Sequence, residues 1–283
     1  MPVQFCKFHG YGNDYIVIEA DHLEGISDLG EFTRRICNRH YGAGADGIAV
    51  IGPAENDEAD FRVRIFNPDG SEAGLSGNGT RCAAAFLHFQ GGWTENVLRL
   101  ITRSGVKRYF LRQRLGLGSF SFESELGQPR FDSASIPMLT PLAKEHVINY
   151  PLEVAGSILP VTAVQVGNPN CCIFVVNFDQ LDWRHLGPLI ENHKQFPERT
   201  NVIFVRVIDR ATVELRIWER GVGHTTASGT CSCAAVVAAI INGRVDRRAT
   251  AKMEGGQVEI QWRDDDEIVL TGSAAFIYCG VWP

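Results

Sequence analysis

Two Ser-Gly pairs, each leading into an alanine-rich apolar segment, are the residues best placed for chemistry. Ser76-Gly77 precedes Cys82-Ala-Ala-Ala, and Ser228-Gly229 precedes Cys233-Ala-Ala-Val. The first turn of a helix exposes unpaired N–H groups and carries a positive partial charge. Because glycine lets the backbone approach a ligand, each pair predicts a site for a carboxylate or phosphate. The simpler interpretation is that either serine is an ordinary N-cap.

The two Ser-Gly pairs belong to an internal repeat with an offset of 152 residues. At this offset the segment FRVRIFN (61–67) falls on VELRIWE (213–219), and both alternate between apolar and polar residues. Such alternation is typical of a half-buried strand. Because strand, Ser-Gly pair and apolar helix recur in one order, the pattern favours gene duplication over chance similarity.

The remaining periodicity predicts an α+β protein of two pseudo-symmetric lobes, each a β-sheet wrapped around a central helix. Many short strands are separated by Gly, Pro, Asn and Asp turns, and helices are expected at 29–38, 79–90, 183–192 and 230–242. We expect an N-terminal lobe over 1–120, to which 271–283 can return, and a C-terminal lobe over 121–270. The Gly/Ser-rich stretch 115–121 marks the expected junction.

Composition excludes several classes of protein. The 283 residues hold 27 Lys plus Arg against 33 Asp plus Glu, a net charge of -6, which disfavours nucleic acid and anionic membranes as partners. The first residues, MPVQFCK (1–7), contain no apolar signal core and no cleavage site of small residues, so we expect no signal peptide. The longest apolar run, 233–241, is too short to cross a bilayer. The eight Cys form no CxxC motif, so we expect buried free thiols in a reducing cytoplasm, with no metal site and no disulfide framework.

Glycine- and asparagine-rich motifs run in a fixed order along nearly the whole chain. They read HGYGND (9–14), GADG (44–47), IFNPDGSE (65–72), GNGxRC (77–82), GNP (167–169), FPxRTNV (196–202), WERGVG (218–223) and GG (255–256). In content and order these motifs resemble the signatures of the diaminopimelate epimerase family. The resemblance implies two similar lobes with the ligand between them and a small amino acid as substrate. It implies no metal, PLP or nucleotide cofactor, and it allows a homodimer.

Members of that family invert an amino-acid α-carbon with two thiols, one removing the proton and the other donating one to the opposite face. Two helix starts suit this chemistry, since each lowers a thiol pKa and stabilises the carboxylate of the carbanion. By motif, the resemblance places Glu219 and Arg220 at the amino and carboxylate groups of the non-reacting end. It assigns the other substrate contacts to Asn13, Asn67, Asn168 and Asn201, with backbone N–H groups for the reacting carboxylate from Gly77, Asn78, Gly229 and Thr230.

The chain departs from the family where the chemistry occurs. Ser76 and Ser228 stand where the family has cysteine, Asn170 replaces its histidine and His224 replaces its glutamate. A hydroxyl is a far poorer base than a thiol of pKa ~8.5, and losing an acid or base costs ~10²–10⁴-fold per group. We take Ser76 and Ser228 as the acid–base candidates. His224, four residues before Ser228, is a further base or activator, or else an ordinary loop histidine.

The leading hypothesis is a cofactor-independent amino-acid epimerase or racemase that resembles diaminopimelate epimerase, an enzyme of lysine biosynthesis. The serines leave two alternatives, a binding-only homologue and a lyase or isomerase of the same fold. Engineered replacement of both cysteines would explain Ser76 and Ser228 but neither Asn170 nor His224.

Overall fold

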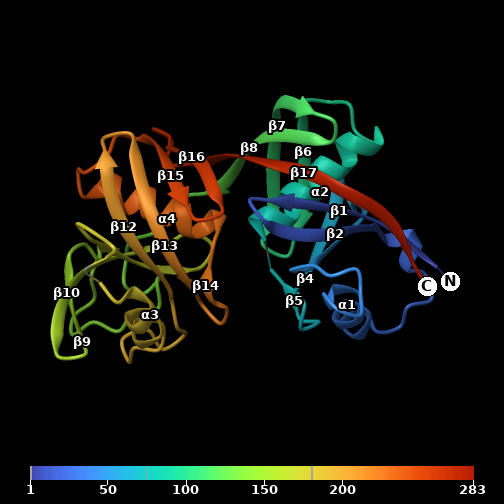
Figure 1. Ribbon diagram of the computed structural model, residues 1–283. Helices are drawn as coiled ribbons and strands as arrows, with labels where there is room; N and C mark the ends of the chain where they lie inside the picture. Colours follow the sequence, from blue (N-terminus) through green and yellow to red (C-terminus); the bar gives the residue numbers. More distant parts are fainter. Residues whose placement is uncertain (1, 75, 180) are drawn as a thin grey trace. The chain divides into compact units, whose positions relative to one another are not determined.

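The computed structural model describes residues 2–74, 76–179 and 181–283, and its chain divides into two compact units. Unit 1 comprises Met1–Glu125 and Thr271–Pro283, and unit 2 comprises Leu126–Leu270. Each unit is a curved β-sheet with one helix against its inner face and a second helix outside (Figure 1).

Unit 1 is a closed ring of strands around helix α2. Neighbouring strands pair in the order β1-β2-β3-β4-β6-β7-β8-β17, and β17 returns to β1. A short hairpin strand, β5, pairs only with β4 among the described residues. The elements are β1 (Val3–Gly10), β2 (Asn13–Glu19), 3-10 helix η1 (Ala20–Leu23), α1 (Leu29–Cys37), β3 (Ile48–Pro53), β4 (Phe61–Phe66), β5 (Glu72–Ala73), α2 (Gly77–Gln90), β6 (Val97–Thr102), β7 (Gly105–Gly116), β8 (Ser119–Gly127) and β17 (Ile268–Trp282).

Helix α2 is buried from Asn78 to His88, and its middle, Cys82–Ala85, is small and apolar. The alanines 83–85 and Cys82 are fully buried against strands β1 to β4. The helix begins after Ser76, whose side chain caps it, and ends before Gly91, which adopts the left-handed conformation at φ 75°. A central helix of small residues lets the strand ring close around it, and its start is held at one end of the ring.

Unit 2 repeats the same plan around helix α4. Its strands pair in the order β9-β10-β11-β12-β13-β15-β16, with the short β14 beside β13. The elements are β9 (Tyr150–Val154), β10 (Ser157–Gln165), β11 (Pro169–Phe174), α3 (Trp183–Glu191), β12 (Asn201–Asp209), β13 (Thr212–Glu219), β14 (Gly223–Thr225), α4 (Gly229–Ile241), β15 (Arg248–Met253) and β16 (Gly256–Trp262).

The strand pairing repeats between the two units, as expected for two pseudo-symmetric lobes. In unit 1 the parallel pairs are β2 with β3 and β4 with β6, and in unit 2 they are β11 with β12 and β13 with β15. The four predicted helices are confirmed to within two residues at each end. The expected junction at 115–121 is the turn of the β7–β8 hairpin, where Gly116 and Gly118 have positive φ, and the units divide after Glu125.

The expectation that all cysteines are free thiols was wrong for one pair. Cys6 and Cys279 form a disulfide, and the other six cysteines are free and buried. The pair is separated by 273 residues, so no sequence motif joins it. It forms because β1 and β17 are antiparallel neighbours whose register places Cys6 directly opposite Cys279.

No helix in the described part of the chain is long and apolar enough to cross a membrane.

Candidate active site

Ser76 and Ser228 occupy equivalent positions, each as the N-cap of the central helix of its unit. Both have extended backbones, with φ -131° and ψ 120° at Ser76 and φ -148° and ψ 124° at Ser228. The carbonyl of Ser76 accepts the N–H of Thr80, and that of Ser228 accepts the N–H of Ser232. The next residues, Gly77 and Gly229, thus present first-turn N–H groups, the geometry that binds a carboxylate.

The two serine hydroxyls differ in their surroundings. Ser76 Oγ accepts the backbone N–H of Gly79 at 3.1 Å and the hydroxyl of Tyr15 at 2.9 Å. Ser228 makes no such side-chain cap bond, and its backbone N–H contacts Met253 Sδ at 3.4 Å. Burial raises the pKa of the neighbouring Cys231 thiol well above its usual value, which disfavours the reactive thiolate.

In unit 1 a chain of hydrogen bonds fixes two of the predicted binding residues. Asn78 Nδ2 donates to Asn13 Oδ1 at 3.1 Å, and Asn13 Nδ2 donates to Asp46 Oδ2 at 3.0 Å. The buried Arg81 donates to Asn78 Oδ1. The side chains of Asn13 and Asn78 are therefore engaged with the protein, and the N–H of Asn78 stays directed along the start of α2.

Charged side chains hold the Asp46 end of this series of hydrogen bonds. Asp14 pairs with Lys7 at 2.8 Å and with Arg39 at 2.9 Å, and Arg39 also pairs with Asp46 at 2.6 Å. Burial alone would raise the pKa of Asp14, but the hydrogen bonds and charges of Arg39 and Lys7 lower it to about 2. No sequence motif indicated this network. It holds the β1–β2 turn next to Asn13, the first residue of β2.

The predicted residue Asn67 lies apart from this chain, at the turn between β4 and β5. Its backbone N–H donates to the Ser71 carbonyl at 2.9 Å and its side chain to Ser71 Oγ at 3.0 Å. These bonds belong to the turn itself. Among the described residues, no hydrogen bond joins Asn67 to Ser76.

In unit 2 the predicted residues form one continuous chain. Asn168 Nδ2 contacts Thr230 Oγ1 at 3.5 Å, and Asn170 Nδ2 donates to the Asn168 carbonyl at 2.7 Å. Asn201 Nδ2 donates to Asn170 Oδ1 at 3.0 Å, and Asn201 Oδ1 accepts the N–H of Arg220 at 2.8 Å. Asn170 thus uses its whole amide as a link, so it supplies neither an acid nor a base where the family has histidine.

Glu219 has the properties of a binding carboxyl. Burial raises its pKa, and within the described parts of the chain its carboxyl oxygens receive no hydrogen bond or ion pair. Glu191 holds the backbone around Glu219, because it accepts hydrogen bonds from Trp218 Nε1 and from the N–H of Gly221, both at 2.8 Å. Glu191 is a buried acid that no motif pointed to. A desolvated carboxyl held in this way suits an ammonium group.

Among the described residues, no hydrogen bond joins His224 to Ser228. His224 lies opposite Trp218 in the β13–β14 pair, and both rings pack toward α3, with Trp183 5.1 Å from the His224 ring. Successive residues of a strand point to opposite faces, so His224 and Glu219 face away from each other. His224 Nε2 instead contacts Glu254 at 2.6 Å, a carboxylate partner that sequence reasoning missed. This geometry gives no support to His224 as a base acting through Ser228.

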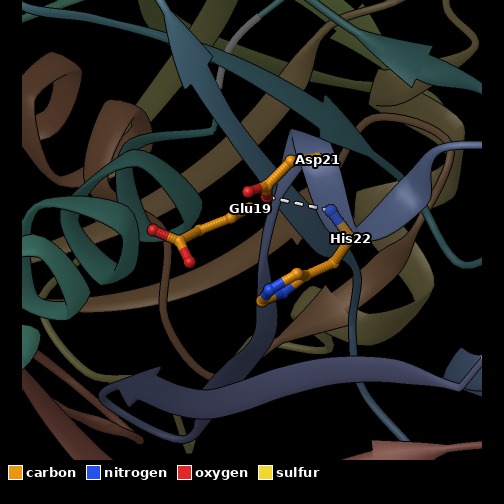
Figure 2. A group of neighbouring side chains, drawn as sticks. All are labelled: Glu19, Asp21 and His22. Atoms are coloured by element: carbon orange, nitrogen blue, oxygen red, sulfur yellow. Dashed lines mark hydrogen bonds between the residues drawn. The ribbon is translucent and has the colours of Figure 1, made fainter.

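One other group of side chains has the composition of a metal site. Glu19, at the end of β2, and Asp21 and His22, on η1, bring possible ligand atoms within 4.8 Å of one another (Figure 2). Asp21 Oδ1 already accepts the backbone N–H of His22 at 2.9 Å, an ordinary turn contact, and both acids are exposed. The turn therefore accounts for the grouping.

A separate surface pocket lies in unit 2 and does not involve the start of α4. It is lined by residues 127–132, Glu145, His146 and Glu267.

Solved structures of other proteins share this fold. Among solved structures, a hydroxyproline epimerase from Agrobacterium vitis matches 99% of this chain and 92% of its own with TM-score 0.72 at 15% identity. A methylitaconate-delta-isomerase matches 99% of this chain and 95% of its own with TM-score 0.65 at 14% identity. At these identities the likeness concerns the fold.

Sequence comparison identifies the family. The family model described as diaminopimelate epimerase matches residues 5–113 and 162–277. Diaminopimelate epimerase from Desulfitobacterium hafniense is 38% identical over 99% of this chain and 98% of its own, and that from Synechocystis is 40% identical over 99% of each. The chain belongs to the diaminopimelate epimerase family and is an isomerase of the epimerase type.

Proposed function

We propose that this protein inverts the α-carbon of diaminopimelate without a cofactor, interconverting the LL and meso forms as a step of lysine biosynthesis in the cytoplasm. The proposal depends chiefly on one observation: Ser76 and Ser228 cap equivalent helices in duplicated units. Epimerisation requires an acid and a base on opposite faces of one carbon. The two serines are the hydroxyls available at equivalent positions, so the proposal assigns these roles to them.

The surrounding groups match the functional groups of such a substrate. The first-turn N–H groups at Gly77, Asn78, Gly229 and Thr230 suit the reacting carboxylate and the negative charge that develops on it. At the other end of the substrate, the desolvated carboxyl of Glu219 suits an ammonium group and Arg220 suits a carboxylate. Asn13, Asn67, Asn168 and Asn201 are assigned to the positions between, as the family motifs place them.

Incubation with LL-diaminopimelate in D2O tests the proposal. We expect deuterium at the α-carbon by mass spectrometry and meso-diaminopimelate by chiral chromatography, at rates well below those of a thiol enzyme because serine is a weak base. Absence of both exchange and meso product would refute the activity. A rise in absorbance from an α,β-unsaturated acid would instead indicate a lyase.

A second candidate function is ligand binding without turnover. Two observations favour it. Ser76, Ser228 and Asn170 all lack the titratable group that the family uses. The hydrogen bonds that link Thr230 to Arg220 through three asparagines are all present. Calorimetric titration distinguishes the two functions, because micromolar binding of diaminopimelate with no α-hydrogen exchange would favour this candidate. The homodimer remains a further proposal, to be tested by light scattering.

A further inference from the structure

Ser76 has a hydrogen-bond environment that Ser228 lacks. Its Oγ receives two donors, the Tyr15 hydroxyl at 2.9 Å and the Gly79 N–H at 3.1 Å. A hydroxyl oxygen has two lone pairs, so these donors occupy both acceptor positions. The proton of Ser76 itself is therefore directed elsewhere, and any negative charge on its oxygen is stabilised by one O–H dipole and one N–H dipole.

The Tyr15 ring is held in a space that two glycines create. Tyr15 lies on β2 and is 5% exposed. A Cβ atom at Gly47 would lie 2.7 Å from Tyr15 Cε1, and one at Gly79 would lie 2.9 Å from the same atom. Both distances are shorter than carbon atoms tolerate, so these positions need glycine for the ring to reach Ser76. The contact is thus built into the packing of β2 against the start of α2.

The carbonyl side of Ser76 is fixed as well. Thr80 donates to it through its backbone N–H at 2.9 Å and through its Oγ1 at 2.7 Å, and Thr80 Oγ1 also contacts the buried Tyr109 hydroxyl. Backbone and side chain of Ser76 are therefore both immobilised. Among the described residues, no donor from a tyrosine is found on Ser228.

We propose that Tyr15 is a positioning residue that makes Ser76 the proton donor of the reaction, an inference that rests on the proposed function. In one direction of the reaction, Ser228 first loses its hydroxyl proton to water, and the resulting alkoxide takes the α-proton and becomes a hydroxyl again. Ser76 then gives its own proton to the opposite face of the same carbon, and the two roles exchange in the reverse direction. The electron pair of the broken O–H bond stays on Ser76 Oγ, where the Tyr15 and Gly79 hydrogen bonds stabilise it, and Tyr15 keeps its proton. Exchange with water restores both serines after product leaves.

The effect of Tyr15 on position 76, and its absence at position 228, can be measured without catalysis by placing a thiol at each serine position. Ser76→Cys and Ser228→Cys, each with and without Tyr15→Phe, are alkylated with iodoacetamide across pH 6–10, and modification is read by mass spectrometry. The six native free thiols are buried and the remaining two form the disulfide, so the parent chain gives the background rate. Ser76 is half-buried and Ser228 is 6% exposed, so each position is compared only with itself, with and without Tyr15→Phe. Only the thiolate reacts.

We expect Tyr15→Phe to slow alkylation at position 76 about tenfold at pH 7, equivalent to a rise of about one pKa unit, and to leave position 228 within twofold. Tyr15→Phe keeps the ring that the two glycines enclose, and circular dichroism checks its folding. An unchanged rate at position 76, or an equal change at both positions, would overturn the role of Tyr15.

The same substitution in the unmodified chain separates failure of this inference from failure of the proposed function. If the chain exchanges α-hydrogen, Tyr15→Phe should lower kcat for exchange about 10- to 100-fold with KM within twofold, since the hydroxyl acts on a reacting group and touches no substrate. Equal kcat values would overturn the inference. If the chain exchanges no α-hydrogen, the proposed function fails, and the alkylation rates still decide whether Tyr15 acts on Ser76.

Discussion

Arg81 Nε donates to the backbone carbonyl of Ser273 at 3.0 Å, joining α2 to β17 across 192 residues of sequence. The guanidinium is 1% exposed, also donates to Asn78 and lies 5.7 Å from the Tyr11 ring centre. Within the described ranges no carboxylate pairs with it. A buried charge is costly unless it is partnered, so a carboxylate at the start of α2 would supply the missing negative charge.

Replacing Arg81 with methionine should therefore weaken both the fold and anion binding. We expect Arg81→Met to lose about 2–4 kcal/mol in urea unfolding, because Asn78 Oδ1 and the Ser273 carbonyl lose their donor, and to weaken diaminopimelate binding about tenfold or more. Arg112→Met is the matched control, since Arg112 forms an exposed ion pair with Glu123 in the same unit and should cost under about 1 kcal/mol. Equal stability of the two variants would refute the structural importance of Arg81.

Placing thiols at the helix starts should raise the rate of α-hydrogen exchange. A thiol has a reference pKa of ~8.5, and the start of a helix lowers it, so the double substitution Ser76→Cys/Ser228→Cys should gain about 10²–10⁴-fold for each group. Deuterium uptake by LL-diaminopimelate measures the gain. The two single variants are the controls, since one efficient base without an efficient acid should give a smaller increase. A double variant no faster than the parent would mean that these serines do not occupy the acid–base positions.

The helix starts were predictable from sequence because several local signals agree there. At Ser76 and Ser228 the cap residue, the glycine that follows and the alanine-rich run all indicate the start of a buried helix, and the repeat makes each position support the other. The α+β class and the duplicated lobes followed from the same alternation and repeat. These features depend on residues close together in the chain.

The partners of those residues were not predictable, since they depend on strand register. Tyr15 reaches Ser76 from 61 residues away, and Glu254 reaches His224 from 30 residues away. Neither pair has a motif of its own. The four-residue spacing to Ser228 favours His224 as a base, but strand alternation turns its ring toward α3. Asn170 likewise stood at a family histidine, yet its contacts show a structural link.

The disulfide between Cys6 and Cys279 should contribute measurably to stability. It closes a loop of almost the whole chain, and chain-entropy arguments give about 2–5 kcal/mol for such a crosslink. Dithiothreitol should lower the Tm of the parent protein but not that of Cys6→Ser. Thiol titration in denaturant should find six thiols before reduction and eight after it. Cys37→Ser, at a buried free cysteine, is the control that should keep its response to reductant. Eight thiols before reduction would refute the crosslink.

Unit 1 should lose stability in mild acid because of His88, which is buried on α2 with the rings of Phe120 and Phe122 beside it. Burial and the charge of Arg114 lower its pKa below the 6.5 of an unfolded chain, so the unfolded state binds the proton more readily. The contribution of neutral His88 to the free energy of unfolding is therefore complete above pH 6.5. It is lost as the pH falls below 6.5, with a slope of at most about 1.4 kcal/mol per pH unit. Asp14, with a pKa of about 2, adds a separate loss only below its unfolded value of 3.8.

Urea unfolding between pH 7.5 and 4.5 should show this slope in the parent and in His40→Gln, an exposed control, and should show it reduced in His88→Phe. An unchanged slope in His88→Phe would assign the mild-acid instability to another group.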